Sequence, residues 1–319
     1  MELKPSDNKL LEHLYHNYRE PLTKIAKATN LSREQVNYKL SRYLSSGLIK
    51  SFFTYFDYSK LGYELPAFLF IKFERQEHFA AFSKMMNNHR NCMSWGEAFS
   101  KYDMYLNCIF KDEKELNQFI ASMVSSPNHL ISEYLVIRPH FTELYPVKFF
   151  GFKRKERLVF FDENSEKSKL DGRDLEILKM LAKDSRARIV DISAKLNISS
   201  ELALYKLRKL KKEGIILGSR AQFDMKKLGC ALSIILLNIR NFSTENQEKV
   251  RKFAAKSDYV NAFTLSLTKP NCIIQMFHRE ESDLIKTLKE IKELFKGDHV
   301  DVEIVLIKEE DKINTLPFL

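Results

Sequence analysis

Apolar residues recur at helical spacing along residues 1–50, and the pattern predicts three short helices there. Ser32 stands where the third helix would begin, and Gly47 stands where it would end. The residues expected to face the core from this third helix are Val36, Leu40, Tyr43 and Leu44. A short β-hairpin is predicted to follow over 49–56. Two helices joined by a tight turn and followed by such a hairpin form a winged helix-turn-helix.

The second half of the chain repeats this plan. Shifting the sequence by 167 positions aligns residues 7–62 with residues 174–229 without a gap, and 18 of the 56 aligned positions are identical. Ser199 and Gly214 then mark the start and the end of the equivalent third helix, whose predicted core residues are Ala203, Leu207 and Leu210. A match of this length without a gap indicates a tandem duplication with a copy of about 150 residues.

The segments that follow each helical stretch alternate between apolar strands and amphipathic helices. Strands are predicted at 66–73, 92–99, 104–110 and 131–137, and again at 231–239, 260–267, 272–277 and 300–307. Helices are predicted at 76–88, 113–125, 244–255 and 281–295. The order βαββαβ is that of a ferredoxin-like unit, an antiparallel sheet with two helices on one face.

The predicted fold class is therefore α+β, with two winged helix-turn-helix domains alternating with two ferredoxin-like domains. The winged domains are expected at 1–56 and 170–223, and the ferredoxin-like domains at 64–148 and 231–310. A basic, aromatic connector at 149–169 links the two copies.

Positive charge is concentrated in the two helical stretches. The chain of 319 residues carries 52 Lys and Arg against 42 Asp and Glu, a formal net charge of +10. Residues 1–50 hold +4 of this excess and residues 170–220 hold +5, while the ferredoxin-like segments are close to neutral. Two basic blocks separated by neutral ones indicate two surfaces that meet a polyanion.

The outward face of each third helix supplies the candidate contacts to double-stranded DNA. Arg and Asn suit bidentate contacts to guanine and adenine edges, whereas Lys, Ser and Tyr suit phosphates. Leu204 replaces the polar Asn37 in the second copy, which is therefore expected to hold the backbone more than to read bases. The predicted DNA-binding residues are Ser32, Arg33, Asn37, Tyr38, Lys39, Ser41 and Arg42, and Ser199, Ser200, Tyr205, Lys206, Arg208 and Lys209.

With these motifs in order, the sequence resembles the Lrp/AsnC (feast/famine) family of prokaryotic transcription regulators. The matching segments are Asn30-Leu-Ser-Arg-Glu-Gln-Val, Gly47-Leu-Ile-Lys and the hinge from Phe56 to Tyr63. The resemblance implies DNA binding, pairing through the ferredoxin-like sheets, and an amino-acid effector. It also implies a Gly-x-Tyr-Asp turn between the second and third strands of the sheet. The first copy keeps Tyr102 and Asp103 of that motif, which are its candidate effector-binding residues, and the second copy has lost it.

The sequence leaves two modes of assembly open. The two ferredoxin-like domains of one chain can pair as an internal pseudo-dimer, so that one chain presents both recognition helices. Alternatively, like domains pair between chains, and the resulting homodimer carries four heads. Because the two third helices differ, an asymmetric or degenerate DNA site is expected rather than a perfect palindrome.

Other function classes have weaker support. No apolar run reaches the length of a membrane span, the N-terminus lacks the plan of a signal peptide, and four scattered cysteines suit a reducing compartment, so a cytoplasmic protein is expected.

No motif for an enzyme, a metal or a cofactor is present. The alternatives are a non-specific architectural DNA-binding protein and an RNA-binding or purely scaffolding protein. The siroheme decarboxylases are similar to the Lrp/AsnC family, but the predicted strands 92–99, 104–110, 260–267 and 272–277 lack the His and Arg expected to line a porphyrin pocket.

Overall fold

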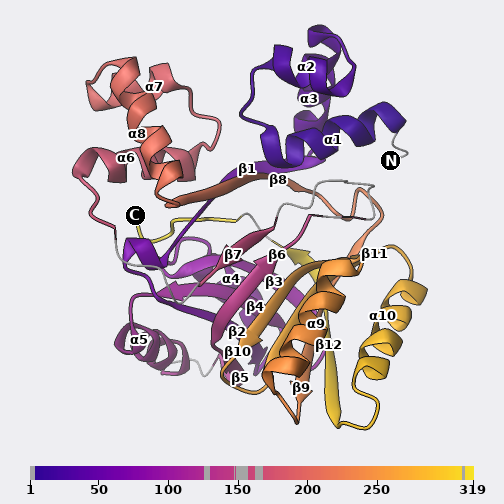
Figure 1. Ribbon diagram of the computed structural model, residues 1–319. Helices are drawn as coiled ribbons and strands as arrows, with labels where there is room; N and C mark the ends of the chain where they lie inside the picture. Colours follow the sequence, from indigo (N-terminus) through magenta and orange to yellow (C-terminus); the bar gives the residue numbers. More distant parts are fainter. Residues whose placement is uncertain (1–3, 126–129, 147, 149–156, 162–167, 311–312) are drawn as a thin grey trace. The chain divides into compact units, whose positions relative to one another are not determined.

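A computed structural model describes the chain except for residues 1–3, 126–129, 147, 149–156, 162–167 and 311–312 (Figure 1). Residues 149–156 and 162–167 of the predicted connector at 149–169 thus lie outside the described residues, and its residues 158–160 form a strand. The chain divides into two compact units, and each unit contains segments of both copies. The head unit comprises residues 1–62, 165–228 and 312–319, and the sheet unit comprises residues 63–164 and 229–311. None of the helices that the structure describes is long and apolar enough to cross a bilayer.

The head unit contains two sets of three helices, each followed by one strand. The first set is α1 (Pro5–Asn17), α2 (Leu22–Thr29) and α3 (Arg33–Ser45), followed by β1 (Ile49–Phe56) and the short 3-10 helix η1 (Ser59–Leu61). The second set is α6 (Gly172–Lys183), α7 (Ile189–Leu196) and α8 (Ser200–Lys212), followed by β8 (Ile216–Phe223). From α2 to β1, each element has a counterpart displaced by 167 residues at both of its ends.

The third helix of each set begins and ends at the residues that the sequence indicates. The Ser32 hydroxyl accepts a hydrogen bond from the Gln35 backbone N–H at 3.1 Å, and the Gln35 side chain accepts one from the Ser32 N–H, so the two residues form a capping box. Ser199 caps α8 through the backbone N–H of Leu202. Gly47 and Gly214 follow the helices with φ of +66° and +67°, a conformation that favours glycine.

The predicted core of α3 is right at three positions and wrong at one. Val36, Leu40 and Tyr43 are buried, whereas Leu44 is 42% exposed. Residues 36, 40 and 43 follow one stripe of the helix, and each further residue turns the side chain by about 100°, which carries Leu44 away from the core. In α8, Ala203, Leu207 and Leu210 are all buried, as predicted.

The predicted hairpin at 49–56 does not form. These residues make the single strand β1, which pairs antiparallel with β8 of the other copy from Ile49 opposite Phe223 to Phe56 opposite Ile216. Helix α1 of the first copy packs against β8, and helix α6 of the second copy packs against β1. The two heads are therefore joined by a shared two-stranded ribbon.

The sheet unit contains one ten-stranded sheet with the order β5-β2-β4-β3-β12-β9-β11-β10-β6-β7. Its strands from the first copy are β2 (Leu65–Phe73), β3 (Cys92–Phe99), β4 (Met104–Phe110), β5 (Ile131–Ile137), β6 (Pro139–Leu144) and β7 (Leu158–Phe160). Those from the second copy are β9 (Ala231–Ile239), β10 (Val260–Ser266), β11 (Cys272–His278) and β12 (Val300–Glu310). The helices are α4 (His78–Met86), α5 (Glu113–Val124), α9 (Thr244–Lys256) and α10 (Glu281–Leu294).

Each copy contributes the end of its last strand to the other copy's sheet. β12 pairs with β9 from Val300 to Ile307 and with β3 from Leu306 to Glu310. In the first copy, β5 pairs with β2, and β6, separated from β5 by one residue, pairs with β10. Residues 139–143 are the equivalents of 306–310, so the two exchanges are related by the repeat. Of the two assemblies that the sequence leaves open, the structure contains the internal pseudo-dimer.

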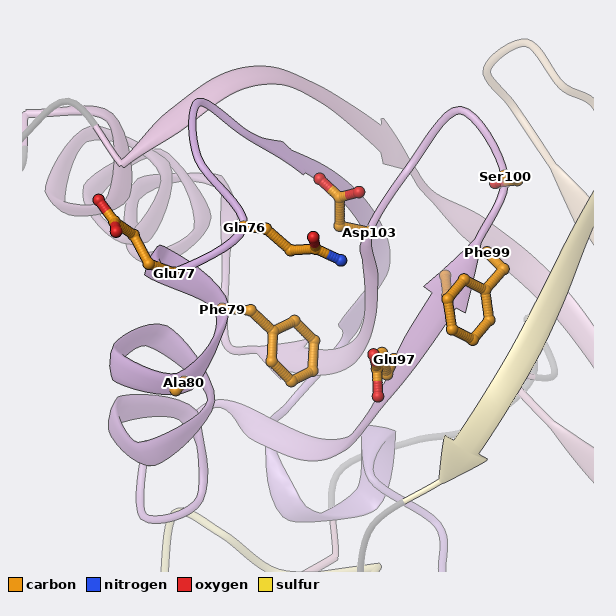
Figure 2. A pocket seen from close by; sticks show the side chains of 9 residues that line it. Gln76, Glu77, Phe79, Ala80, Glu97, Phe99, Ser100 and Asp103 are labelled. Atoms are coloured by element: carbon orange, nitrogen blue, oxygen red, sulfur yellow. The ribbon is translucent and has the colours of Figure 1, made fainter.

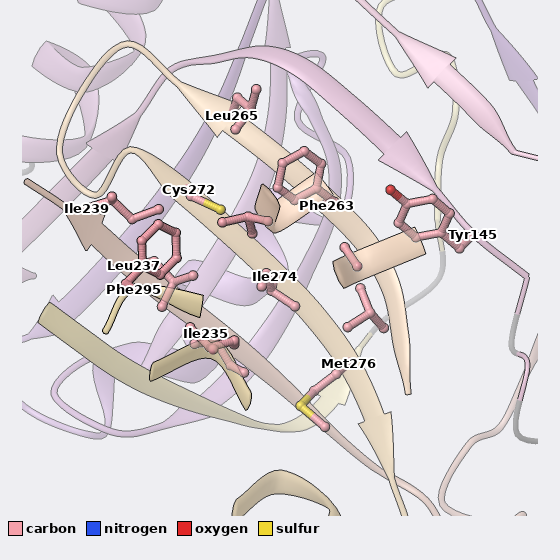
Figure 3. Close-up of a cluster of buried hydrophobic side chains, with 14 of the residues drawn as sticks. Tyr145, Ile235, Leu237, Ile239, Phe263, Leu265, Cys272, Ile274, Met276 and Phe295 are labelled. Atoms are coloured by element: carbon pink, nitrogen blue, oxygen red, sulfur yellow. The ribbon is translucent and has the colours of Figure 1, made fainter. Parts of the chain in front are cut away.

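Alternating apolar residues on the strands form one core beneath each pair of helices. In the second copy, Leu237, Phe263 and Ile274 are fully buried on the face that α9 and α10 cover (Figure 3). The first copy has an equivalent core around Leu69, Leu106 and Phe119. Burial of each such side chain contributes roughly 1.5–3 kcal/mol. These cores hold the strands in the register that pairs the two copies.

Candidate nucleic-acid interface

The recognition helices α3 and α8 present most of the predicted DNA-binding side chains to solvent. On α3, the exposed residues are Arg33, Asn37, Tyr38, Ser41 and Arg42. On α8, they are Ser200, Tyr205 and Arg208, while Lys209 is half-buried with its ammonium group 3.8 Å from Glu213. The equivalent tyrosines Tyr38 and Tyr205 are 67% and 63% exposed. Ser32 and Ser199 are exposed too, but their hydroxyls cap the helices.

Two of the predicted contacts are corrected by the structure. Lys39 and Lys206 were expected on the outward face, but their ammonium groups turn back onto the first helix of their own head. Lys206 is 8% exposed and lies 2.9 Å from Asp174 and 2.6 Å from Asp171. The Lys39 ammonium lies 2.5 Å from the buried carboxylate of Asp7. In this arrangement both lysines fix the recognition helix rather than contact phosphate.

The acid–lysine pair is the same in both heads, but its third member differs. In the first head, the Tyr43 hydroxyl donates a second hydrogen bond to Asp7. Burial opposes ionisation of Asp7, yet the bonds from Lys39, Tyr43 and the Lys4 backbone keep the pKa of its carboxyl below the usual value. In the second head, Leu210 occupies the position of Tyr43, and Asp171 supplies a second carboxylate instead. The bond from Lys206 lowers the pKa of Asp171 to about 2.

A second pair of lysines links the two heads to each other. The ammonium of Lys60, which follows β1, donates to the carbonyl of Glu213 at the end of α8, at 2.6 Å. The ammonium of Lys227, its equivalent, donates to the carbonyl of Ser46 at the end of α3. Cations satisfy the free carbonyls at helix C-termini and interact favourably with the helix dipole. Each copy therefore caps the recognition helix of the other.

This reciprocal cap explains identities that sequence analysis assigned to a hinge. A Cβ added at Gly47 would lie 2.8 Å from the Lys227 ammonium, and one at Gly214 would lie 3.1 Å from that of Lys60. The glycines thus serve both the left-handed turn and the approach of the lysine. The signal was present in the identity of Lys60 with Lys227 and of Gly47 with Gly214. What sequence could not reveal is that each lysine reaches across to the other copy.

The two candidate effector-binding residues do not line the same space. Asp103 lies at a cavity of about 330 Å³ in the sheet unit, with its carboxylate bonded to the Lys72 ammonium and the Phe73 N–H, both at 2.9 Å. Figure 2 shows Glu97 beside the ring of Phe79, and the Gln76 side chain between that ring and Asp103. Tyr102 is buried elsewhere, with its ring 5.6 Å from that of Phe70. The residues that line the cavity are Gln76, Glu77, Phe79, Ala80, Glu97, Ala98, Phe99, Ser100 and Asp103.

Metal-binding geometry is not found among the described residues, which contain no group of three His, Cys, Asp or Glu side chains able to hold an ion. The four cysteines are buried free thiols. Of the four strands in which we noted no histidine, β11 extends one residue further than predicted and ends at His278. The His278 ring is bonded to the Ser233 hydroxyl at 2.9 Å. The unpredicted strand β6 carries a second histidine, His140.

Comparison with known proteins connects this geometry to gene regulation. A family model described as winged helix-turn-helix DNA-binding matches residues 170–216. The HTH-type transcriptional regulator FL11 of Pyrococcus furiosus is 31% identical over 120 residues, which are 38% of this chain and 78% of that protein. The uncharacterized HTH-type transcriptional regulator PH0061 of Pyrococcus horikoshii is 26% identical over 149 residues, which are 46% of this chain and 99% of that protein. Such regulators match less than half of this chain but most of their own length, as expected for a chain that contains two copies.

A similar fold over nearly the whole chain is found among solved structures. The siroheme decarboxylase NirDL superposes with a TM-score of 0.64, covering 98% of this chain and 95% of that chain, at 14% sequence identity. At this identity the likeness shows the fold alone.

The buried ion pair between Lys206 and Asp174 predicts that Lys206→Met lowers the free energy of unfolding. Removal of the ammonium leaves Asp174 buried without its ionic partner, which costs about 3–5 kcal/mol. Lys209→Met on the same helix should change the free energy of unfolding by less than about 0.5 kcal/mol. Urea unfolding of the full chain, followed by circular dichroism, measures both values.

A pH series distinguishes loss of the ion pair from a general packing defect. Because Asp171 has a folded pKa of about 2 against its usual 3.8, its contribution is present above pH 4 and is lost as the pH falls from about 4 to about 2. Lys206→Met should reduce this loss, because the largest cause of the lowered pKa of Asp171 is removed while its backbone hydrogen bonds from Asp174 and Arg173 remain. An unchanged dependence on pH in the variant would show that Lys206 does not stabilise the head through Asp171.

The reciprocal caps predict that Lys60→Ala/Lys227→Ala loosens the connection between the heads. Each lost charge-assisted bond is worth about 1–3 kcal/mol, so the double variant should be less stable. It should also bind DNA with a broader preference for the distance between half-sites. Titration against duplexes whose half-site spacing increases in single base pairs measures this preference. Lys179→Ala, at an exposed lysine of α6 that pairs with Glu176, serves as the control; equal spacing preferences for all three proteins would contradict the idea.

Proposed function

Because this chain belongs to the Lrp/AsnC family of transcription regulators, we propose that it binds double-stranded DNA sequence-specifically through both of its heads. The observation that carries the proposal is the ribbon of β1 and β8, which joins two recognition helices with exposed polar and cationic faces in one compact unit. Dimeric regulators read two half-sites one helical turn apart, roughly 34 Å. Here a single chain supplies both recognition helices.

The two heads divide the work of recognition. Arg33, Asn37 and Arg42 on α3 are exposed and suit guanine and adenine edges. On α8, Ser200 and Leu204 stand in place of Arg33 and Asn37, and the cations Arg208 and Lys209 lie further along the helix. We assign base reading mainly to the first head and phosphate binding mainly to the second, without Lys206. The preferred site is accordingly asymmetric.

Selection of duplexes from a random library by the full chain tests this function. Winning duplexes are titrated at two salt concentrations beside unrelated duplex DNA and RNA. An enriched site with two unlike halves, bound at least ~10³-fold more tightly than unrelated DNA, supports a sequence-reading regulator. Salt-sensitive binding without enrichment favours the architectural alternative instead. No binding to duplex DNA refutes the proposal and directs attention to RNA and to tetrapyrroles, whose absorption spectrum shifts on binding.

The division of labour predicts different effects for Asn37→Ala and Lys209→Ala. Asn37→Ala should lose about 1–3 kcal/mol of discrimination at one base pair of the first half-site. Lys209→Ala should weaken binding to every duplex alike and reduce the slope of log affinity against log salt by about 1. Titration of both variants against the selected duplex and its single-base variants measures these effects. Equal losses on all sequences from both changes would contradict the division.

We also propose that an amino-acid effector binds in the first copy at the cavity beside Asp103. The carboxylates of Asp103 and Glu97 already pair with Lys72 and Lys308, each at 2.9 Å, so an effector ammonium would bind by sharing these carboxylates with the lysines. The Phe79 and Phe99 rings suit an apolar side chain. The second copy has Pro270 at the position of Asp103, so it is not assigned an effector.

The effector proposal predicts a ligand-dependent gain of stability. One of the common amino acids at 100 times its dissociation constant should stabilise the chain by about 2.7 kcal/mol, seen as a higher melting temperature. Asp103→Asn should abolish the shift, while Glu133→Gln, at a carboxylate that pairs with Lys101, should keep it. A shift that survives Asp103→Asn, or the absence of a shift with all twenty amino acids, would overturn this site.

A further inference from the structure

The pseudo-twofold axis of the head unit passes between Phe53 and Arg220. These residues are directly opposite each other in the β1–β8 ribbon, flanked by Phe52 opposite Ala221 and Thr54 opposite Ser219. Arg220 follows Phe53 by 167 residues, so each is the equivalent of the other in the repeat. In a ribbon made of two identical copies, the residue at this place would face itself.

Arg220 is 3% exposed, and its charge lies against two aromatic rings of the first copy. Its guanidinium carbon lies 5.2 Å from the ring centre of Tyr15 and 5.6 Å from that of Tyr55. One guanidinium nitrogen also donates to the Tyr15 hydroxyl at 3.3 Å. Stacking on aromatic rings stabilises a cation most where water is excluded.

A ribbon made of two second copies would lack these aromatic partners for Arg220. The equivalents of Tyr15 and Tyr55 are Ala182 and Gln222. If two β8 strands paired in the same register, two Arg220 side chains would face each other with Cβ atoms about 5 Å apart. Like charges directly opposite each other destabilise a strand pair, and burial without compensation adds a larger cost.

We propose that Arg220 makes β8 selective for β1, so that like copies cannot pair and every head unit contains one head of each kind. This surface accepts the first copy's strand and rejects a second β8. A homodimer with four heads, in which like copies pair, therefore cannot form through this ribbon. The consequence for DNA, that each complex presents one α3 and one α8, rests on the proposed function; the selectivity itself does not.

Engineered cysteines report like pairing directly. In a β8–β8 ribbon around residue 220, position 219 of one chain faces position 221 of the other, whereas in the observed ribbon these positions face Thr54 and Phe52. The full chain carrying Ser219→Cys/Ala221→Cys is oxidised at concentrations from about 10 µM to about 1 mM, the range in which a second chain competes with a tethered partner. The same reporter is placed in the Arg220→Phe background, and Thr54→Cys/Ser219→Cys serves as the positive control for the observed ribbon.

With Arg220 in place, the reporter should give no covalent dimers on a non-reducing gel at any concentration. With Arg220→Phe, which places two phenylalanines at the axis, covalent dimers should appear and increase with concentration. Equal amounts of covalent dimer in both backgrounds, or none in either, would overturn the role of Arg220. None of these readouts involves DNA, so the proposed function can fail while this inference holds, and the reverse.

A double-mutant cycle tests the electrostatic cause. Phe53→Arg creates two facing arginines within one chain and should lower the melting temperature by about 5–10 °C. Phe53→Arg/Arg220→Phe restores a single arginine at the axis and should regain at least half of that loss. If the double variant is no more stable than Phe53→Arg alone, the cost of a buried arginine at position 53, rather than like-charge pairing, explains the effect and the proposal is wrong.

Discussion

The structure depends on strand edges that one copy cannot satisfy by itself. A lone strand such as β1 exposes a row of backbone donors and acceptors, and these groups require partners wherever the strand is buried. The second copy supplies them through β8, and the same completion occurs where β12 joins β3 and where β6 joins β10. The duplication therefore does not give two independent regulators in series. It gives two units, each of which is complete only with both copies.

Placing both copies in one chain frees them to differ. Positions that build the head remain alike, such as the lysines of the buried acid–lysine pairs and Lys60 with Lys227. Some positions that face outward have diverged, as Asn37 and Leu204 have, while others, such as Tyr38 and Tyr205, remain identical. Identical chains in a homodimer cannot separate these two roles, because any change appears in both halves. A pseudo-dimer can keep these framework contacts in both halves while other positions differ, on the recognition surface as at Asn37 and Leu204 and within the ribbon as at Phe53 and Arg220.

Elements that form for local reasons follow the pattern in the sequence, and elements that depend on tertiary contacts do not. Capping serines and helical spacing predicted α3 and α8 correctly, because Ser32 and Ser199 bond within their own first turns. The partner of β1 lies in the other copy, 167 residues away, whereas the pattern of residues 49–56 alone predicts pairing within the segment, as a hairpin. Strand β6 was missed because it begins at Pro139, which is unfavourable within sheets except at strand starts and edges. Lys39 and Lys206 were misplaced because a long side chain can leave the outward face for an acid on another helix.

The same architecture supports both a regulator and, in NirDL, an enzyme, so the fold cannot by itself assign the function. What distinguishes the two is where the side chains with suitable chemistry lie. The described strands of the sheet unit contain no arginine and two histidines, His140 on β6 and His278, which is bonded to Ser233 at the end of β11. By contrast, Arg33, Arg42 and Arg208 are exposed on the recognition helices, outside the hydrophobic core. Two exposed cationic helices joined through one ribbon suit a large polyanion outside the protein.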